Sequence, residues 1–418
     1  VKAGQFYQQA LVLDKTFKPA LLSLAGLALN QQHWSQAIAY YQQILATTPN
    51  DSLTLQLLAD AAPVAILNAT AFSAKGEDGT APLDGPGCPV WQVALSTARR
   101  KDWQMADRGL SPADLAMHVV LPEVDGRIFA GVASFKSPTA RDPDLQFSRF
   151  AHRADDSRIR AVVARVAAWH RLGTTPAPAR QLALILSTYP GKDYNLAHAV
   201  GLDALASTEA ILAALQGAGF VTTPGEALGR ALETATIDWP LTAYRAALET
   251  LPEALQADLA TAWGAPEADP ACTDGAFRFR ALRRGRALIA LQPERGEVAA
   301  RDGEYHDLSR TPRHAYVAFY LWLRAQGLHA LIHIGAHGTL EWLPGKSVAL
   351  SGTCWPEALT RDWPVLYPFI VNDPGEAAQA KRRLGAVTIG HIPPALVQAE
   401  TGAGLGRLEA LLDEYANA

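Results

Sequence analysis

Two short apolar runs place the strongest limit on how this chain can fold. Residues 182–187 read LALILS, and residues 328–336 read LHALIHIGA. Neither run holds a charged side chain, and each predicts a strand buried on both faces. The first run leads into the loop 188–192 (TYPGK) and then into a helical stretch through Leu215, after which Val221 is expected to begin the next unit. Strand, glycine loop, helix and strand in this order predict a doubly wound parallel sheet, whose ligands bind beyond the carboxyl ends of the strands.

The remainder supplies further elements of the same kind. Residues 157–172 have the spacing of an amphipathic helix, with Val162, Val166 and Trp169 on one face. A short buried strand is expected at residues 64–67, and further apolar runs stand at 119–121 and 128–132. Helical segments are expected at 225–268, 375–384 and 405–415, and residues 176–178 (PAP) are expected to be a linker.

Residues 1–60 differ from the remainder in composition. They hold three lysines and no arginine, whereas the remainder holds 28 arginines and six lysines. Residues 7–11 (YQQAL) return as 41–45 (YQQIL), an offset of 34 residues. That period resembles the tetratricopeptide repeat (TPR), in which pairs of helices stack. Because fewer than two full repeats are visible, a helical hairpin docked on another part of the protein is an equal alternative.

The overall composition excludes several classes of protein. Thirty-seven basic against 41 acidic residues give a net charge of −4, which disfavours nucleic-acid binding. The cysteines Cys88, Cys272 and Cys354 are odd in number and far apart, so they form neither a disulfide framework nor a CxxC zinc site. No apolar run is long enough to span a membrane, and the opening segment lacks the apolar core of a signal peptide. We therefore expect a cytoplasmic protein, and its first residue, valine, fits a fragment.

The densest chemical stretch follows the second apolar run and reads HIGAHGTLEWLPGKS over residues 333–347. His333, His337 and Glu341 stand at four-residue steps there. Imidazole and carboxylate suit a borderline divalent ion such as Co²⁺ or Zn²⁺, and they equally suit proton removal from a weakly acidic N–H. For His333 the simpler interpretation is a satisfied position inside the sheet. The order of residues is not HExxH, and Leu340 stands where a Walker A motif needs glycine, so neither a zincin protease nor an ATPase is predicted.

A second pair of carboxylates lies in the segment LPEVDG, residues 121–126, which is expected to be a tight turn between apolar runs. Asp125 precedes a glycine, and stabilisation of the turn explains it as well as a chemical role does. Glu123 follows a proline and has no such structural reason. We therefore predict that Glu123 is catalytic or handles a metal ion.

Five segments together resemble the CobN/magnesium chelatase H-subunit family. They are LPEVDGRIFAG (121–131), STYPGK (187–192), AHAVGLDA (197–204), HGTLEWLPGK (337–346), and the segment 367–394 that starts YPFIVNDPGEAAQAKRRLG. Thr339 and Trp342 favour the CobN type, the large subunit of aerobic cobaltochelatase. The related magnesium-chelatase H subunits carry similar motifs but have Ser and Phe at these two positions. The resemblance spans residues 63–418 and a middle portion of a much longer subunit, whereas residues 1–60 resemble no part of it.

The resemblance implies a class I metal chelatase, a ligase that forms nitrogen–metal bonds. Its large subunit binds the tetrapyrrole and the metal, while two AAA+-type partner subunits hydrolyse Mg-ATP. For the CobN type it implies insertion of Co²⁺, as a substrate, into the corrinoid precursor hydrogenobyrinic acid a,c-diamide in aerobic cobalamin biosynthesis. No bound organic cofactor, nucleic acid or membrane span is expected. The chain is expected to be inactive without the partners and the regions it lacks.

Family positions and charge together predict the site residues. The predicted catalytic residues, on the family's LPE and HGxLE motifs, are Glu123, His337 and Glu341. The predicted metal ligands are His337, Glu341 and His333. The predicted contacts for the macrocycle and its peripheral carboxylates are Lys346, Arg127, Lys192 and Trp342.

The expected fold is α/β and multidomain, with doubly wound parallel-sheet units preceded by a short all-α TPR-like segment. Four parts are expected: the helical repeats at 1–60, a region with the LPEVDG motif at 61–175, a domain with the STYPGK loop at 176–270, and a region with the HGTLEWLPGK motif at 271–418. Three alternatives remain open: a magnesium chelatase H-type protein, a TPR interaction protein carrying an inactive chelatase segment, and a stand-alone His/Glu metal hydrolase.

Overall fold

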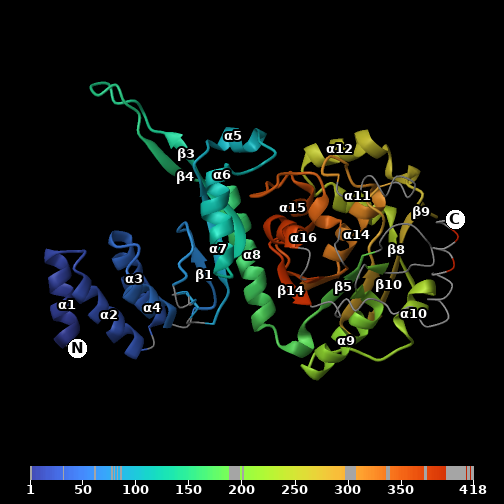
Figure 1. Ribbon diagram of the computed structural model, residues 1–418, viewed down its shortest axis with the longest axis horizontal. Coiled ribbons are helices and arrows are strands. Elements are labelled where there is room, and N and C mark those ends of the chain that lie inside the picture. The colour runs from blue at the N-terminus through green and yellow to red at the C-terminus, as the bar shows by residue number, and fades with distance from the viewer. Residues whose placement is uncertain are drawn as a thin grey trace.

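A helical segment, a four-stranded sheet and an eight-stranded sheet follow one another along the long axis of the molecule (Figure 1). The structure is a computed structural model. It describes residues 2–31, 33–60, 63–76, 79, 81, 83–84, 87–187, 198–199, 202–296, 307–335, 339–370 and 374–391, together with residues 411 and 415. None of the helices in these ranges is both long enough and apolar enough to cross a lipid bilayer.

Four helices form the N-terminal segment. They are α1 (Lys2–Leu13), α2 (Lys18–Asn30), α3 (Trp34–Thr47) and α4 (Ser52–Asp60), and consecutive helices pack on one another. Their core sets the small side chains of Ala25 and Ala28 against Tyr41 and Ile44. Small residues let helix axes approach closely and leave room for the tyrosine ring, as in stacked helix pairs. The identification as tetratricopeptide repeats stays a prediction.

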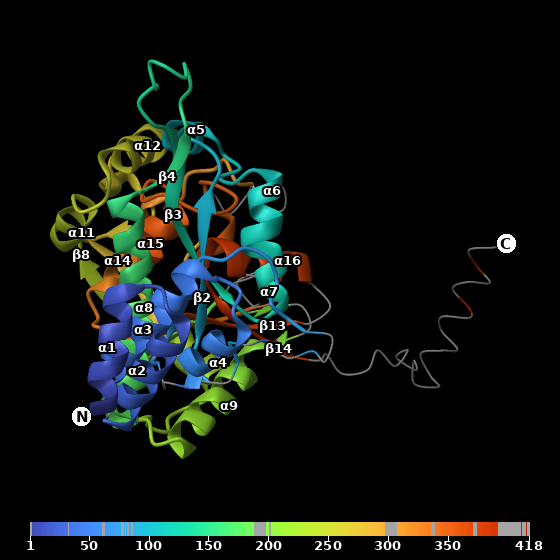
Figure 2. The ribbon, with the colours of Figure 1, turned by 90° about the vertical axis from the view of Figure 1, so that its left-hand side faces the viewer.

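The first sheet has the order β1-β2-β3-β4. Strands β1 (Ile66–Asn68), β2 (Val90–Ser96) and β3 (Ile128–Pro138) are parallel, and β4 (Phe150–Ala154) pairs antiparallel with β3. Beyond the sheet the β3–β4 hairpin projects from the body of the molecule (Figures 1 and 2). Helix α8 (Asp156–Thr174) covers one face and confirms the helix predicted at 157–172. Its first turn is capped by Asp155, which accepts a hydrogen bond from the Arg158 backbone N–H.

The other face of this sheet carries α5 (Arg100–Met105) and one continuous helical segment, seen opposite α8 in Figure 2. That segment consists of α6 (Pro112–Leu115), a π-helical turn η1 (Ala116–Val120) and α7 (Leu121–Val124). The expectation of a tight turn at residues 121–126 is therefore wrong for Glu123, which is helical. The wider π turn directly precedes Pro122, which has no N–H to donate and would clash with a carbonyl in a regular α-helix. The turn comes at Gly126, whose φ is +74°.

The second sheet has the order β14-β13-β12-β5-β11-β10-β8, with β9 (Cys272–Thr273) beside β10. Both predicted strands are present and adjacent at its centre, β5 (Leu182–Leu186) and β12 (Ala330–Ile334), and every residue of both is buried. Strands β11 (Ala287–Leu291), β13 (Val365–Ile370) and β14 (Val387–His391) are parallel to them. One end of the sheet is mixed, because β10 (Ala276–Arg284) runs antiparallel to both β11 and β8 (Thr236–Pro240).

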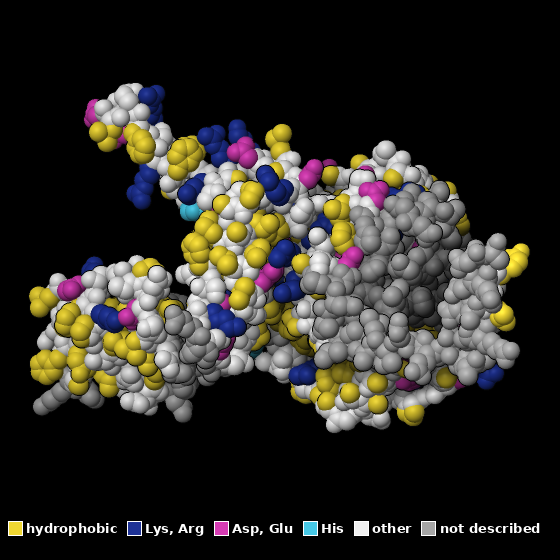
Figure 3. All heavy atoms as spheres, in the orientation of Figure 1, with side chains coloured by type: hydrophobic (Ala, Val, Ile, Leu, Met, Phe, Trp, Pro, Cys, Tyr) yellow, Lys and Arg dark blue, Asp and Glu magenta, His cyan; other side chains and the backbone are white. Residues whose placement is uncertain are grey.

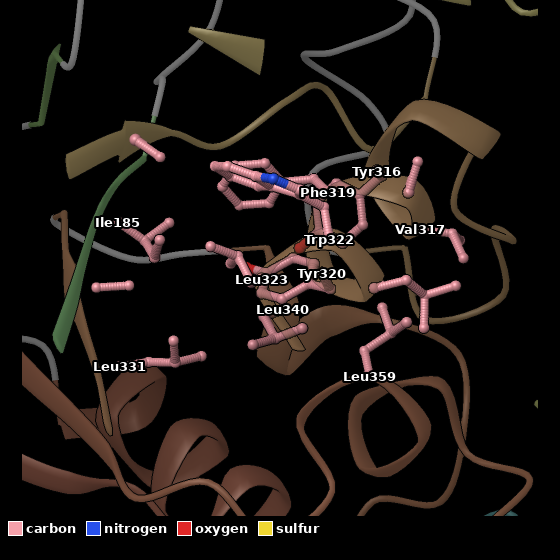
Figure 4. Packing of buried hydrophobic residues seen from close by; sticks show 14 of the residues in the cluster. Ile185, Tyr316, Val317, Phe319, Tyr320, Trp322, Leu323, Leu331, Leu340 and Leu359 are labelled. Carbon is pink, nitrogen blue, oxygen red and sulfur yellow. The ribbon is translucent and has the colours of Figure 1, made fainter. Parts of the chain in front are cut away.

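Helices cover both faces of this sheet, as a doubly wound fold requires. Helices α9 (Ala204–Gly217) and α10 (Leu228–Thr234) pack on Leu182, Leu184 and Leu186. The opposite face carries α11 (Leu241–Leu248), α12 (Glu253–Trp263), α14 (His314–Arg324) and α15 (Trp355–Thr360). Figure 4 shows how Phe319 and Trp322 of α14 lie among the side chains of this core. Ten consecutive residues of α14 are buried, so this helix is the centre of the larger core.

Two predictions for this region are wrong. Strand β8 interrupts the helical stretch expected at 225–268, because its partner β10 offers an edge for pairing. No strand begins at Val221, whose carbonyl accepts a hydrogen bond from Arg286 in a loop. The helix expected at 375–384 is confirmed as α16 (Pro374–Gln379) followed by a second π-helical turn, η6 (Ala380–Leu384). The helix expected at 405–415 lies outside the described residues, apart from positions 411 and 415.

Candidate functional site

A group of buried polar side chains occupies the carboxyl edge of the second sheet. His333 of β12 is fully buried, and Ser187 and Gln292 follow the neighbouring strands β5 and β11. The His333 Nδ1 atom lies 3.4 Å from Ser187 Oγ, and its Nε2 atom lies 3.3 Å from Gln292 Nε2. The His333 ring stacks on Tyr367 of β13, with ring centroids 5.1 Å apart. His333 is therefore held inside the sheet, the simpler of its two interpretations.

The same group of polar side chains links helix α14 to Thr339 of the HGTLEWLPGK segment. Gln292 donates a hydrogen bond of 2.9 Å to Tyr316 OH, and Thr339 Oγ1 donates one of 3.2 Å to Gln292 Oε1. The hydroxyls of Tyr316 and Thr339 are 2.9 Å apart. Burial raises the pKa of both Tyr316 and Tyr320, so these phenols stay protonated. The network positions Thr339, which lies two residues after His337.

Burial of His333 gives the protein a specific sensitivity to acid. It lowers the pKa of His333 from 6.5 to about 4. The unfolded chain therefore binds a proton here that the folded chain does not, and stability falls as the pH drops from about 6.5 to about 4. This group contributes a loss of at most about 3 kcal/mol, complete below about pH 4. We expect His333→Gln to flatten the dependence of the unfolding free energy on pH in this window.

Urea unfolding at pH 7, 6, 5 and 4 measures the effect. The matched control is His170→Gln, since His170 is exposed on α8, and it should keep the wild-type pH dependence. Equal slopes for wild type and His333→Gln between pH 6.5 and 4 would contradict the assignment.

Glu341 and Trp342 lie on a single 3₁₀ turn, Leu340–Trp342, and are tied to two different elements. Glu341 is fully buried, and its Oε1 atom accepts a hydrogen bond of 3.1 Å from Tyr367 OH. The Trp342 indole N–H donates one of 3.0 Å to Glu376 Oε2 on α16. The HGTLEWLPGK motif is thus held to β13 through Glu341 and to α16 through Trp342.

Glu123 forms an ion pair with Arg382 of the π turn η6. Arg382 Nη2 donates to Glu123 Oε2 at 2.8 Å, and Arg382 Nε lies 3.2 Å from Oε1. The side chains are 12% exposed for Glu123 and 27% exposed for Arg382. A pocket of about 250 Å³ adjoins the pair and is lined by Glu123, Lys381 and Thr388 among others. Glu123 is thus an ion-paired carboxylate that lines a small pocket.

Apolar side chains are exposed on the helix that carries this carboxylate. Val120, Leu121 and Val124 are exposed on the helix that carries Glu123. In Figure 3 apolar side chains gather over the α6–α7 region. Exposed apolar side chains beside a carboxylate suit a large, mainly apolar ligand that exchanges a proton.

The neighbouring arginine, Arg383, holds the second motif. Its guanidinium donates to three backbone carbonyls, those of Glu341, Leu343 and Lys346, with distances of 2.8 Å to Leu343 O and 3.0 Å to Lys346 O. Arg383 is buried, and burial lowers its pKa to about 10. Two consecutive residues of one turn therefore hold Glu123 and the backbone at residues 341–346 of the HGTLEWLPGK segment.

Two of the cations predicted to contact the macrocycle are engaged within the fold. Lys346 Nζ donates to the carbonyls of Gln104 at 3.0 Å and Ala106 at 2.8 Å. Arg127 forms a buried ion pair of 2.7 Å with Asp125. Because both cations already have partners inside the protein, we do not carry Lys346 and Arg127 into the proposed substrate contacts.

His337 and Lys192 lie outside the described residues, so the predictions for them are unchanged. Among the residues that are described, no three His, Cys, Asp or Glu side chains are grouped so as to hold a metal ion. Sequence reasoning missed Arg382, Arg383 and Gln292. The available signal for the arginines was their tandem position in the family segment 367–394.

Comparison with known proteins gives one consistent result. A family model described as CobN/Magnesium Chelatase matches residues 26–418. The match begins earlier in the chain than the resemblance found in the sequence, which begins at residue 63. The chain is 40% identical over 385 residues to the aerobic cobaltochelatase subunit CobN of Sinorhizobium sp, covering 87% of this chain and 30% of that protein. It is 28% identical over 336 residues to the H-type magnesium-chelatase subunit of Rhodobacter capsulatus, covering 74% of this chain and 28% of that protein.

A solved structure agrees with these relatives. The catalytic subunit of cobaltochelatase from Mycobacterium tuberculosis superimposes with a TM-score of 0.72 at 34% sequence identity, covering 87% of this chain and 33% of that one. The chain thus spans about 30% of the length of the CobN relative that it matches.

Proposed function

Because the chain belongs to the CobN/magnesium chelatase family, we propose that it is part of the large, tetrapyrrole-binding subunit of an ATP-dependent cobaltochelatase. The proposed reaction inserts Co²⁺ into hydrogenobyrinic acid a,c-diamide in aerobic cobalamin biosynthesis. The higher identity to the CobN relative, 40% against 28% for the magnesium-chelatase subunit, supports this function over the magnesium alternative.

The observation that carries the proposal is the tandem Arg382-Arg383. Arg382 pairs with Glu123 of the LPE motif, and Arg383 binds the carbonyls of Glu341, the last residue of HGxLE, and of Leu343 just after it. The two motifs are far apart in the chain, yet one π turn holds them together. A turn that joins both motifs supports a single site built from them.

The chemistry of metal insertion assigns a role to each motif. Two protons must leave the ring nitrogens of the macrocycle while the metal ion loses water. Glu123 is the proposed proton acceptor, since its carboxylate lines a pocket and apolar side chains are exposed on the same helix. His337 and Glu341 are the proposed handlers of Co²⁺. A small number of weak ligands suits a metal ion that must be passed on to a macrocycle.

Energy for the reaction would come from elsewhere in the complex. The sequence holds no Walker A motif, so two AAA+-type partner subunits are the proposed sites of Mg-ATP hydrolysis. The cytoplasm is the proposed location. The interaction-protein and metal-hydrolase alternatives have no comparable structural support, since neither uses the link between Glu123 and the HGxLE segment.

Absorbance titration of the purified chain tests the proposal. Hydrogenobyrinic acid a,c-diamide and protoporphyrin IX are titrated in parallel. The expected result is a saturable spectral shift with the corrinoid precursor only. A shift with protoporphyrin IX alone would contradict the cobaltochelatase assignment in favour of a magnesium chelatase, and no shift with either would contradict tetrapyrrole binding by this chain.

A further inference from the structure

A cavity of about 350 Å³ lies between the two sheet regions. Its walls come from β3 and α8 of the first region and from α15, η6 and the loop between α11 and α12 of the second. Two carboxylates line it, Glu357 and Asp362, and five arginines: Arg158, Arg165, Arg361, Arg382 and Arg383. The lining is therefore strongly cationic.

Arg165 is 9% exposed and, unlike the more deeply buried Arg383, donates to only one backbone carbonyl among the described residues. Its Nη1 atom donates to Ala130 O at 3.1 Å. Within the part of the chain that the structure describes, no carboxylate lies within ion-pair distance of it. The fold makes room for this side chain at Gly385, where a Cβ atom would lie 3.0 Å from Arg165 Nη1. Burial disfavours the charge of Arg165 and lowers its pKa, and Glu357 and Asp362 offset this only without direct contact. A ligand carboxylate in direct contact would offset more of the cost of burying this cation.

Of the other arginines, Arg158 and Arg383 already have partners within the protein, whereas Arg361 is accessible to a ligand. Arg158 is paired with Glu357 at 2.7 Å, and the guanidinium of Arg383 is taken by three carbonyls. Arg361 is exposed at the end of α15, with a φ of +50° in the left-handed region, and among the described residues no carboxylate pairs with it. Arg165 inside the cavity and Arg361 at its edge therefore hold the charge that remains available.

Arg382 connects this cavity to the proposed active site. It lines the cavity, and the same guanidinium pairs with Glu123. A cavity of this size takes a short carboxylate-bearing arm but not a four-ring macrocycle. A ligand whose ring lies near Glu123 would thus reach the cavity with a peripheral group only.

We propose that this cavity binds a peripheral carboxylate of the tetrapyrrole substrate, with Arg165 as its inner partner and Arg361 as its outer one. The inference rests on the proposed function and names which charged groups of the chain recognise the substrate. A planar guanidinium offers two parallel N–H donors to a carboxylate, so binding is geometrically specific as well as electrostatic.

The first experiment tests the anion site without any tetrapyrrole. Succinate and inorganic phosphate are titrated into the chain by calorimetry at constant ionic strength. We expect succinate to bind, Arg165→Gln to raise its Kd at least tenfold, and Arg361→Gln to raise it about threefold. The control is Arg160→Gln, an exposed arginine on the same helix that does not line the cavity. Unchanged succinate binding in both cavity variants, or tighter binding of phosphate than of succinate, would overturn the proposal.

The second experiment uses the macrocycle. Hydrogenobyrinic acid a,c-diamide is compared with its fully esterified form, which lacks free carboxylates. We expect Arg165→Gln and Arg361→Gln to weaken binding of the acid and to leave binding of the ester unchanged. Arg361 is exposed, so its variant keeps the test valid where Arg165→Gln fails to fold.

The two proposals fail in different ways. Macrocycle binding that is equally strong in wild type and both cavity variants would overturn the cavity inference alone. Succinate binding that depends on Arg165, without binding of either macrocycle, would overturn the proposed function and with it the assignment of the carboxylate to a tetrapyrrole.

Discussion

Replacing Arg383 by methionine is expected to lower the free energy of unfolding by at least about 3 kcal/mol. Arg383 is buried, and its guanidinium donates to the carbonyls of Glu341, Leu343 and Lys346. Methionine fills part of the space but donates to none of them. A buried carbonyl that loses its donor costs about 1–3 kcal/mol, and three lose theirs at once. Removing the buried charge also removes its desolvation cost, which offsets part of this loss of stability. The three backbone carbonyls nevertheless stay without a donor.

Urea unfolding followed by circular dichroism measures the loss. The matched control is Lys381→Met, which makes the same kind of change two residues earlier in η6, at a half-buried lysine. It should change the unfolding free energy by less than about 1 kcal/mol. A loss for Arg383→Met no larger than that of the control would show that the HGxLE segment does not depend on this arginine.

Glu123→Gln is expected to lower the rate of cobalt insertion by the assembled chelatase by about 10²–10⁴-fold. Glutamine keeps the shape of the side chain but accepts no proton from a ring nitrogen. Loss of the charge in this mostly buried pair with Arg382 should cost about 1–3 kcal/mol of stability, while the shape of the side chain is kept. Tetrapyrrole binding, measured by the absorbance titration, should therefore change little while turnover is lost.

The control is Glu226→Gln, which removes a glutamate from an exposed ion pair with Arg230. It should leave the insertion rate unchanged. A Glu123→Gln variant that inserts cobalt within threefold of the wild-type rate would remove Glu123 from the mechanism, and equal loss of binding and turnover would make it a binding residue.

Local sequence patterns predicted the central strands of the second sheet better than the strands at its antiparallel edge. Strands β5 and β12 are continuous apolar runs because helices cover both faces, and nothing outside the run is needed to recognise them. The mixed edge was missed. Strand β10 alternates buried Phe277, Phe279 and Ala281 with exposed arginines, a pattern that an adjacent antiparallel partner stabilises.

The site was predictable in its motifs but not in its contacts. The family positions singled out Glu123 and Glu341, whose roles stay predictions, whereas the charge of Lys346 and Arg127 said nothing about which partners those cations meet. Lys346 binds carbonyls of residues 104 and 106, which only the packing of the first region on the second brings near. Arg383 was missed for the same reason, since its partners lie about 40 residues earlier in the chain.

The two π turns make the geometry of the Glu123–Arg382 pair sensitive to the number of residues in each turn. Glu123 lies three residues after the end of one of them, and Arg382 lies within the other. Each residue of a regular helix rotates the next side chain by about 100°, so deleting a single residue from either turn would reset the angular phase of everything after it. Such a deletion would barely alter composition or hydropathy, yet it would point the carboxylate and the guanidinium away from each other. Point substitutions leave that phase unchanged, so among relatives the geometry of this pair should be inherited or lost through insertions and deletions.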